Sequence, residues 1–360
     1  MEISKGKVNP LFWKGKKVFL TGHTGFKGSW LSLWLQNMGA LVKGYSLDVN
    51  NKPALFTKAN IEKDMESEIG DIRNLEQLTQ SMVNFGPEIL IHMAAQPLVR
   101  LSYQEPVDTY STNVIGTVNV LEAARKCLNL KAIISVTTDK CYENKEWEWG
   151  YRENDKLGGH DPYSASKVGT EIVVESYIKS FFKNSILKNR ISTARAGNVI
   201  GGGDYSANRL IPDIISAINN KKKLKIRSPN HIRPWQHVLD PLMGYLILAK
   251  KQYIGKVDNK LHSWNFGPNI NNFKKVIDIV KYIKNLERFE YILTKNDVNF
   301  KETEILKLNS LKAKKKLNWT SKWNLTKSIK KTLEWNENIN NGISAKEMCE
   351  RQFLMYINKD

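Results

Sequence analysis

The chain has few cysteines, no long hydrophobic run and fewer acidic than basic residues. Its three cysteines among 360 residues, Cys127, Cys141 and Cys349, lie far apart and lack the spacing of metal ligands. They argue against a disulfide framework or a zinc site and favour a reducing cytoplasm. No stretch of about 18 apolar residues is present, as a membrane-spanning helix would need. The N-terminal segment lacks the apolar core of a secretion signal. From these absences together we expect a cytoplasmic protein with no metal and no membrane partner.

The shortage of acidic residues leaves a formal net charge of +19, from 55 Lys and Arg against 36 Asp and Glu. Such a charge is compatible with a nucleic-acid surface. However, the lysines are spread along the chain and are not interleaved with aromatic residues, as a platform for stacking bases would require. We interpret them as solvated helix faces and expect no nucleic-acid partner, although a positive field would attract an anionic substrate.

Short apolar segments alternate with helical ones along the chain. We expect strands at residues 17–20, 41–47, 89–93, 132–136 and 192–195. Helical spacing marks residues 29–38, 113–126, 212–219, 273–284, 307–317 and 325–336, and residues 224–226 are typical of an edge strand. This alternation predicts the α/β class, with a Rossmann-type doubly wound parallel sheet and a smaller C-terminal lobe.

A glycine-rich turn joins the first expected strand to the first helix. Gly22, Gly25 and Gly28 are spaced G-x-x-G-x-x-G, which allows a tight turn and close approach of a pyrophosphate to the helix N-terminus. Downstream, Asp48 either accepts a hydrogen bond from an adenosine ribose, which would favour NAD over NADP, or caps a loop. We expect Asp71, next to Ile72, to hold an adenine amine at the sheet edge. The sequence therefore predicts NAD as cofactor.

Small residues past a later strand belong to the same expected site. Ala94, Ala95 and Gln96 follow residues 89–93, where small side chains either let a cofactor lie against the backbone or pack a helix on the strand. The full set of expected cofactor-binding residues is Gly22, Thr24, Gly25, Phe26, Lys27, Gly28, Asp48, Asp71, Ile72, Ala94, Ala95, Gln96, Asn113, Tyr163 and Lys167.

Two further segments carry candidate acid–base groups. Tyr163 and Lys167 are four residues apart, on one face of a helix. A nearby ammonium and a positive nicotinamide ring would lower the phenol pKa from ~10, making Tyr163 a base for a sugar hydroxyl. Asp139 and Lys140 follow an apolar strand. This adjacent acid and amine indicate a second proton transfer, and elimination of water is the obvious one.

These motifs resemble the extended short-chain dehydrogenase/reductase family of nucleotide-sugar enzymes. The resemblance is carried by residues 21–28, 92–96, Asn113, and Tyr163 with Lys167. Within the family the chain is most similar to the CDP-glucose 4,6-dehydratases, in residues 96–100, 139–142, 147–154, 196–204, 209–213, 233–238 and 264–268. The match runs from about Trp13 to Gln352. His160, Ala165 and Tyr205 depart from the pattern, in positions expected near the sugar-nucleotide pocket.

The resemblance implies conversion of CDP-glucose to CDP-4-keto-6-deoxyglucose and water with no net redox change, in cell-surface polysaccharide synthesis such as that of O-antigen. Tyr163 would act on the C4 hydroxyl, with Lys167 holding the ribose. Asp139 would be the acid at C6. Lys140 would be the base at C5 or a salt-bridge partner of Asp139, and Thr138 would bond O4 or cap the backbone.

Substrate anchoring requires cations for a diphosphate. Arg209 and Arg233 are placed by motif, and each guanidinium either matches phosphate oxygens or pairs with a carboxylate across the lobes. Asn198, Arg100 and His237 complete the expected substrate-binding set. His237 has no Ser or Cys partner motif and is interpreted as a structural or hydrogen-bonding histidine, and Trp235 either packs in the core or contacts the sugar.

The family also implies a domain division and an assembly. We divide the chain into residues 1–190, an NAD-binding domain that includes the Tyr163 helix, and residues 191–360, mainly a sugar-nucleotide-binding lobe with segments that return to the sheet. A homodimer or homotetramer is expected through a helix bundle that includes the Tyr163 helix. Alternative functions are a nucleotide-sugar 4-epimerase, a dehydratase for another nucleotide sugar, and a non-catalytic dinucleotide- or nucleic-acid-binding module.

Overall fold

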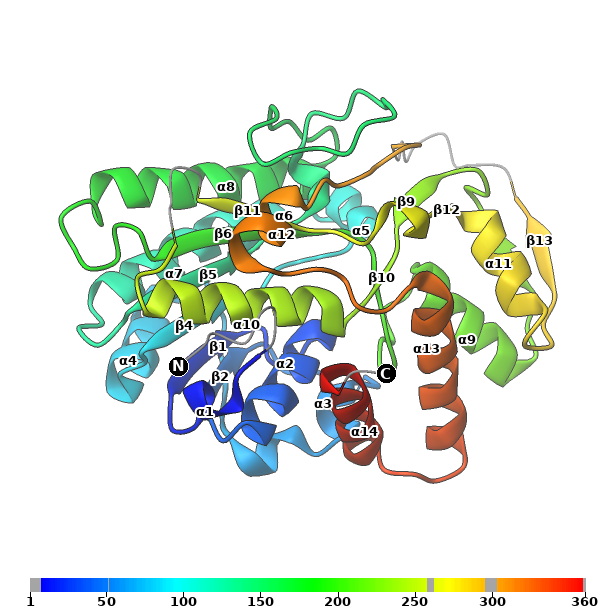
Figure 1. The fold of residues 1–360 in the computed structure, drawn as a ribbon, viewed down its shortest axis with the longest axis horizontal. Helices are drawn as coiled ribbons and strands as arrows, with labels where there is room; N and C mark the ends of the chain where they lie inside the picture. The colour runs from blue at the N-terminus through cyan, green and yellow to red at the C-terminus, as the bar shows by residue number, and fades with distance from the viewer. Residues whose placement is uncertain (1–7, 51, 258–261, 295–302, 359–360) are drawn as a thin grey trace.

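A seven-stranded sheet forms the centre of the computed structural model, which describes residues 8–50, 52–257, 262–294 and 303–358 (Figure 1). Its order is β11-β6-β5-β4-β1-β2-β3, and each neighbouring pair is parallel. The strands are β1 (Lys17–Thr21), β2 (Leu41–Ser46), β3 (Glu66–Ile69), β4 (Ile89–His92), β5 (Ala132–Val136), β6 (Ile191–Ala196) and β11 (Ser263–Phe266). The order reverses beside β1, as in a doubly wound fold, which confirms the predicted class.

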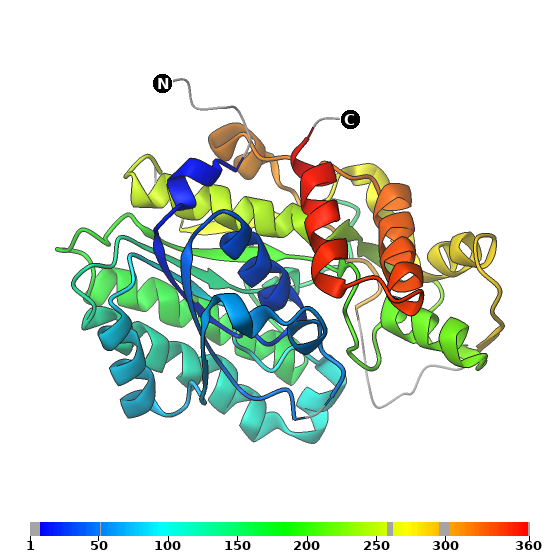
Figure 2. The ribbon, with the colours of Figure 1, turned by 90° about the horizontal axis from the view of Figure 1, so that it is seen from below.

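Helices cover both faces of the sheet. One face is packed by α2 (Phe26–Asn37) and α10 (Leu239–Tyr253), and the other by α4 (Leu75–Phe85), α7 (Gly116–Arg125) and α8 (Pro162–Ser180). Successive strand residues alternate between the two cores, because side chains of a strand point to opposite faces. Val18 and Leu20 join one cluster, and Phe19 joins the other. Figures 1 and 2 show α10 and α8 on opposite sides of the sheet.

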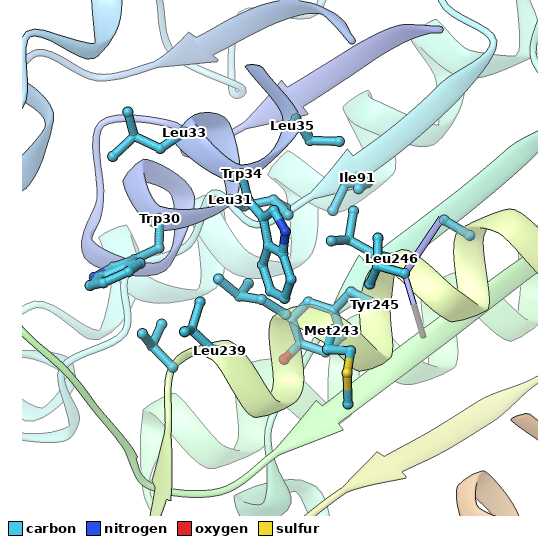
Figure 3. Packing of buried hydrophobic residues seen from close by; sticks show 14 of the residues in the cluster. Trp30, Leu31, Leu33, Trp34, Leu35, Ile91, Leu239, Met243, Tyr245 and Leu246 are labelled. Carbon is cyan, nitrogen blue, oxygen red and sulfur yellow. The ribbon is translucent and has the colours of Figure 1, made fainter. Parts of the chain in front are cut away.

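Aromatic side chains hold α2 in place behind the glycine turn. Trp30 and Trp34 are fully buried in the same cluster as Met243 and Leu246 of α10, and the ring of Trp34 points toward α10 (Figure 3). Phe353 of the C-terminal helix α14 (Ala345–Ile357) stacks on Trp34, with 5.4 Å between ring centroids. The C-terminal segment thus fixes the first crossover helix, whose N-terminus faces the expected dinucleotide site.

A smaller lobe lies at one end of the sheet, on the right in Figure 1. It has its own apolar cluster, which includes residues of α9, α11 and α13. Its elements are α9 (Leu210–Asn220), α11 (Val276–Lys284), α13 (Leu325–Asn340), and the strand pairs β8 (Leu224–Ile226) with β13 (Tyr291–Leu293), β9 (Ile232–Pro234) with β12 (Phe273–Lys275), and β7 (Val199–Ile200) with β10 (Gln236–His237). Because β6, α10 and β11 pack with the large sheet, a division at residue 190 stays a prediction.

Short elements complete the fold. They are α1 (Pro10–Trp13), α3 (Leu55–Lys58), α5 (Val99–Gln104), α6 (Pro106–Tyr110), α12 (Leu311–Leu317), the 3-10 turns η1 (Ile61–Asp64), η3 (Asp139–Cys141) and η4 (Ile270–Asn272), and the π-helical turn η2 (Ser111–Ile115). None of the described helices combines the length and the apolar character needed to cross a membrane.

Two expected helices are shorter than their sequence patterns predict. Residues 273–275 form β12, antiparallel to β9, and helix α11 begins only at Val276. Residues 307–310 are not helical, because Leu308 forms a β-bridge with Tyr151, and α12 begins only at Leu311. In both cases pairing with a distant segment prevails over local helical spacing. The strands expected at residues 17–20, 41–47, 89–93, 132–136, 192–195 and 224–226 are confirmed to within one or two residues.

The glycine turn is closely packed. Gly22 has φ +78°, and a Cβ there would lie 2.7 Å from the amide nitrogen of Ala94. A Cβ on Gly28 would lie 2.0 Å from the carbonyl oxygen of Gly22, whereas one on Gly25 would come no closer than 3.4 Å. Glycine at 22 and 28 therefore lets α2 begin directly against the end of β1.

Replacing Gly28 with alanine will destabilise the fold, because its Cβ must displace backbone rather than a mobile side chain. We expect Gly28→Ala to lose about 2 kcal/mol of unfolding free energy. Gly25→Ala, where the backbone (φ −75°, ψ 166°) accepts any residue, should stay within about 0.5 kcal/mol of the wild type. Denaturant unfolding of the two variants provides the measurement, and equal midpoints would contradict the packing argument.

Candidate active site

A cleft with a cavity volume of about 530 Å³ opens where β5 and β6 end and the smaller lobe begins. Residues 137–140 line it after β5, and residues 197–201 after β6. Residues expected from the sequence that line this cleft are Phe26, Lys27, Arg100, Thr138, Asp139, Lys140, Tyr163, Asn198, Arg209, Arg233 and Trp235. The structure thus brings together the acid–base segments and the cations of the smaller lobe.

Tyr163 occupies the first turn of α8 and is held from several directions. The carboxylate of Asp161 caps this helix by accepting from the Ser164 amide at 2.9 Å, and the Tyr163 amide donates to the Ser102 hydroxyl at 3.1 Å. The Tyr163 hydroxyl shares a hydrogen bond with Thr138. The phenol therefore has a defined position in the cleft.

The protonation of Tyr163 is set by burial and by the charges around it. Burial raises the pKa of this phenol to about 12, and the negative charge of Asp139 adds to the effect, while Arg209 and the Thr138 bond oppose it. The neighbouring Lys167 donates to the Val136 carbonyl at 3.4 Å, and burial lowers the pKa of its ammonium to about 8. Among the protein's own groups desolvation outweighs the nearby positive charge of Arg209, so a lowering of the phenol pKa by Lys167 together with a nicotinamide ring stays a prediction.

Asp139 is a buried carboxyl group with one oxygen available. Its Oδ1 accepts from the Thr138 hydroxyl at 3.1 Å, whereas its Oδ2 is buried without a hydrogen-bond partner in the described part of the chain. Burial raises the pKa of Asp139 to about 6, against the opposing effects of Lys140, Thr138 and Arg233. Such a group can hold a proton near neutral pH and give it to a bound molecule.

Lys140 stands beside Asp139 without pairing with it. Within the described residues no ion pair joins the two, although the charge of Lys140 lowers the pKa of the Asp139 carboxyl. The salt-bridge interpretation of Lys140 is therefore not supported. Thr138 does cap the backbone, since its hydroxyl accepts from the Lys140 amide at 3.3 Å, and it also bonds Tyr163. A contact of Thr138 with O4 of a sugar stays a prediction.

The two expected phosphate-binding arginines differ in their surroundings. Arg209 pairs with Asp204 at 3.3 Å and keeps about a third of its side chain exposed. Arg233 is almost buried and donates to the carbonyls of Ile232 and Glu304, at 3.0 and 3.1 Å. Both line the cleft, so pairing with a neighbour and facing the cleft are compatible.

Some cleft residues were not foreseen from the sequence. Arg227, Ser228 and His231 line the cleft from the segment between β8 and β9. The only signal for them is their closeness in sequence to the motif around Arg233. Lys27 was expected at the cofactor. Burial lowers the pKa of its ammonium to about 7, with smaller contributions from the charges of Lys167 and Arg209.

The residues around the glycine turn fit a dinucleotide. Helix α2 begins at Phe26, so its first-turn amides have no helical acceptor and can bind an anion. Thr24 donates to the Leu47 carbonyl at 3.0 Å and ties the turn to the end of β2, where Asp48 is exposed. Asp71 is engaged on both oxygens by Arg73, which holds the pKa of this carboxyl below its usual value. Roles for Asp48 and Asp71 toward adenosine remain predictions.

Three residues of the expected cofactor set have other partners. The Asn113 side chain bonds the backbone of Gln96 at 2.8 and 3.1 Å and donates to Ser166 at 2.8 Å. The Gln96 side chain is used by Leu98 and Thr109. Ile72 packs in the core under α7. These side chains therefore brace the loop after β4 and the sheet rather than offering free groups to a cofactor.

His237 lies outside the set of cleft residues. It is fully buried, with its ring 4.6 Å from Trp323 and 6.0 Å from Trp30, and burial lowers its pKa to about 3. This position does not support substrate contact. His160, Ala165 and Tyr205, expected near the sugar-nucleotide pocket, also do not line the cleft.

The known proteins to which this chain is similar include several nucleotide-sugar 4,6-dehydratases. A model of the GDP-mannose 4,6 dehydratase family matches residues 19–332. CDP-glucose 4,6-dehydratase of Salmonella typhimurium is 48% identical over 92% of this chain and 93% of its own length. Human dTDP-D-glucose 4,6-dehydratase is 26% identical over 93% of this chain and 94% of its own. Among solved structures, dTDP-glucose 4,6-dehydratase of Streptomyces venezuelae, with NAD bound, has a TM-score of 0.78 at 18% identity, covering 92% of this chain and 99% of that one.

The buried carboxyl group of Asp139 predicts a specific pH dependence of stability. Its pKa is raised from 3.8 to about 6, so its contribution to stability is complete below 3.8 and is lost as the pH rises through about 6. Relative to the wild type, Asp139→Asn should therefore gain on the order of 3 kcal/mol between about pH 4 and pH 7. Denaturant unfolding across this range measures the difference.

Asp71→Asn is the control of opposite sign. Arg73 lowers the pKa of Asp71, so this variant should lose stability relative to the wild type as the pH rises from about 3 to 5. A pH-independent difference for Asp139→Asn would contradict the assignment of a desolvated carboxyl.

Proposed function

We propose, from the premise that this chain belongs to the GDP-mannose 4,6 dehydratase family, that it converts CDP-glucose to CDP-4-keto-6-deoxyglucose and water. The observation that carries the proposal is the meeting of Tyr163 with Asp139 and Lys140 in one cleft, joined through Thr138. A dehydratase needs one group to act at C4 and an acid–base pair for C5 and C6. The choice of CDP-glucose follows the 48%-identical relative.

The cofactor is NAD, held by the glycine turn and its surroundings. The residues that would hold it are Gly22, Thr24, Gly25, Phe26, Lys27, Gly28, Asp48, Asp71, Ala94, Ala95 and Lys167. When bound, NAD supplies the acceptor for a hydride from C4 of the sugar and returns that hydride to C6.

Tyr163 takes the proton of the C4 hydroxyl. Its raised phenol pKa, about 12, means that the protein's own charges do not activate it fully. The cations around it, Lys167 and Arg209, and the bound substrate and cofactor must supply the rest. Lys167 is positioned for this from the same face of α8.

Asp139 and Lys140 carry out the elimination. The ketone at C4 acidifies the C5 proton, which Lys140 removes as the uncharged amine. Asp139 gives its proton to the departing C6 hydroxyl, so that water leaves and the C5–C6 bond becomes double. As C6 accepts the returning hydride, Lys140 gives its proton back to C5, and the proton that Tyr163 took replaces the one that Asp139 gave up. The raised pKa of Asp139 keeps that proton available near neutral pH.

The diphosphate of the substrate is bound by cations of the smaller lobe. Arg209 and Arg233 match phosphate oxygens with planar guanidinium groups, and Arg100 and Asn198 line the same cleft. Trp235 is nearly buried and donates its indole N–H to the Lys274 carbonyl, so it forms part of the cleft wall.

Two further points belong to the proposal. The three cysteines are buried free thiols, in keeping with work in the reducing cytoplasm.

The assembly is a homodimer, or a pair of dimers, through the face formed by α6, η2 and α8. These three elements contact one another and carry exposed apolar side chains, namely Val107, Tyr110, Ile115 and Ile172, and exposed apolar side chains are typical of an interface.

Substrate turnover tests the function directly. We expect CDP-glucose to give a 4-keto sugar, detected as a chromophore in alkali, with kcat/KM at least about tenfold above that for dTDP-, UDP- or GDP-glucose. Formation of CDP-galactose without the chromophore would instead identify a 4-epimerase. Salt-dependent DNA retardation without turnover would identify a binding module.

Single substitutions separate the oxidation from the elimination. Lys140→Ala should lower product formation by about 10²-fold or more while reduced nicotinamide accumulates, because oxidation at C4 no longer leads to elimination. Tyr163→Phe should give neither product nor reduced nicotinamide. Product assays and near-ultraviolet absorbance measure both effects. Lys156→Ala, on the exposed pair with Glu143, is the lysine control. Wild-type kcat in Lys140→Ala would refute its role as the base.

A further inference from the structure

Glu171 is a buried carboxylate with four hydrogen-bond donors. It lies on α8, two turns beyond Tyr163 and one beyond Lys167. Its oxygens accept from the hydroxyls of Thr137 and Thr193, at 2.5 and 2.7 Å, and from Nε and Nη2 of Arg195, at 2.9 and 2.8 Å. The carboxylate therefore joins α8 to the end of β5 and to β6. Although burial opposes it, Arg195 holds the pKa of Glu171 below its usual value.

The ion pair between Glu171 and Arg195 is connected to both sides of the acid–base turn. Thr137, bound to Glu171, immediately precedes Thr138 and Asp139. Tyr142, just after that turn, accepts from Nη1 of Arg195 at 2.8 Å and donates to Asn265 at 2.7 Å. The segment 138–141 is thus flanked by Thr137 and Tyr142, whose side chains bond the two members of the same buried ion pair.

The other half of the active site has independent anchors. Tyr163 is held by the capped start of α8 and by Ser102, and Lys167 by the Val136 carbonyl. Among the described residues, the Asp139 carboxylate has a single hydrogen-bonded oxygen, Oδ1, which accepts from Thr138 of the same turn. The Glu171–Arg195 pair therefore ties both ends of the segment around η3 to α8, in addition to the contact of Tyr163 with Thr138 and the bond from the Gly158 amide to the Cys141 carbonyl.

A buried ion pair is weak evidence for a gain in stability, because desolvation offsets the attraction of the charges. Well-oriented charges with every polar atom bonded do impose a single geometry on the elements they join. Catalysis requires such geometry, since a displacement of 1 Å at reacting groups can cost about 10²-fold in rate.

We propose that Glu171 and Arg195 are positioning residues that hold Asp139 and Lys140 in place against Tyr163, and that they control the elimination of water more than the oxidation at C4. The inference rests on the proposed function. It concerns residues that do not line the cleft and act through Thr137 and Tyr142.

The test uses substitutions that remove single hydroxyl groups, because Glu171→Gln would leave Arg195 buried without its partner and could prevent folding. Thr137→Val and Tyr142→Phe each detach one side of η3 from the pair. Thr193→Val is the matched control, since it removes a hydroxyl from the same carboxylate on the β6 side. Tyr151→Phe is the control for Tyr142→Phe, because Tyr151 stacks on Tyr142 at 5.1 Å but has no bond to Arg195.

We expect Thr137→Val and Tyr142→Phe to lower kcat for the 4-keto product about tenfold, with KM within about twofold and with accumulation of reduced nicotinamide. Thr193→Val and Tyr151→Phe should keep kcat and show no such accumulation, even where their melting temperatures fall equally. A purely structural role of these residues would not cause reduced nicotinamide to accumulate.

Unchanged kcat in both test variants would overturn the inference, as would an equal effect in the controls or a loss of kcat without reduced nicotinamide. Failure of the proposed function is distinguishable, because in that case the wild type itself forms no 4-keto product from CDP-glucose.

Discussion

Parallel pairing throughout the seven-stranded sheet is the constraint on which the site depends. Because all strands run in one direction, their carboxyl ends reach the same edge. The glycine turn after β1, the loop after β4, the acid–base turn after β5 and the segment after β6 are far apart in sequence but converge there. The crossover helices, held by cores such as that around Trp30 and Trp34, keep these loops in register. The parallel direction of the strands therefore brings the residues that line the cleft together.

Desolvation decides the charge states in the cleft more than neighbouring charges do. Burial raises the pKa of Tyr163 to about 12 and of Asp139 to about 6, and it lowers the pKa of Lys167 to about 8. Asp139 and Lys167 move toward values suited to proton transfer near neutral pH, whereas Tyr163 moves away. In the proposed reaction, burial alone therefore favours proton transfer by Asp139, whereas activation of the Tyr163 phenol depends on charges that arrive with the bound molecules.

The sequence predicted the strands of the sheet well, because they depend on local patterns. Apolar runs such as residues 132–136 form strands whose pairing partners β4 and β6 are equally buried, and the Tyr163–Lys167 spacing is a property of any helix. Helix α11 shows the limit, since residues 273–275 pair with β9 instead of continuing the helical pattern. Asn113 and His237 show it for the site. Their residue types suit ligands, but Asn113 bonds Gln96 and Ser166, and His237 packs between two tryptophans.

By itself, the sequence determined the α/β class, the glycine turn after the first strand and the choice of candidate acid–base residues, because each depends on the spacing of neighbouring residues. Only the tertiary structure decided which side chains face the cleft, which are already bonded, and how far burial changes their protonation. It also brought Glu171, Thr137, Arg195 and Tyr142 together around the acid–base turn. Hydrogen bonds between distant segments and the exclusion of water arise only when the chain is packed, so no local pattern records them.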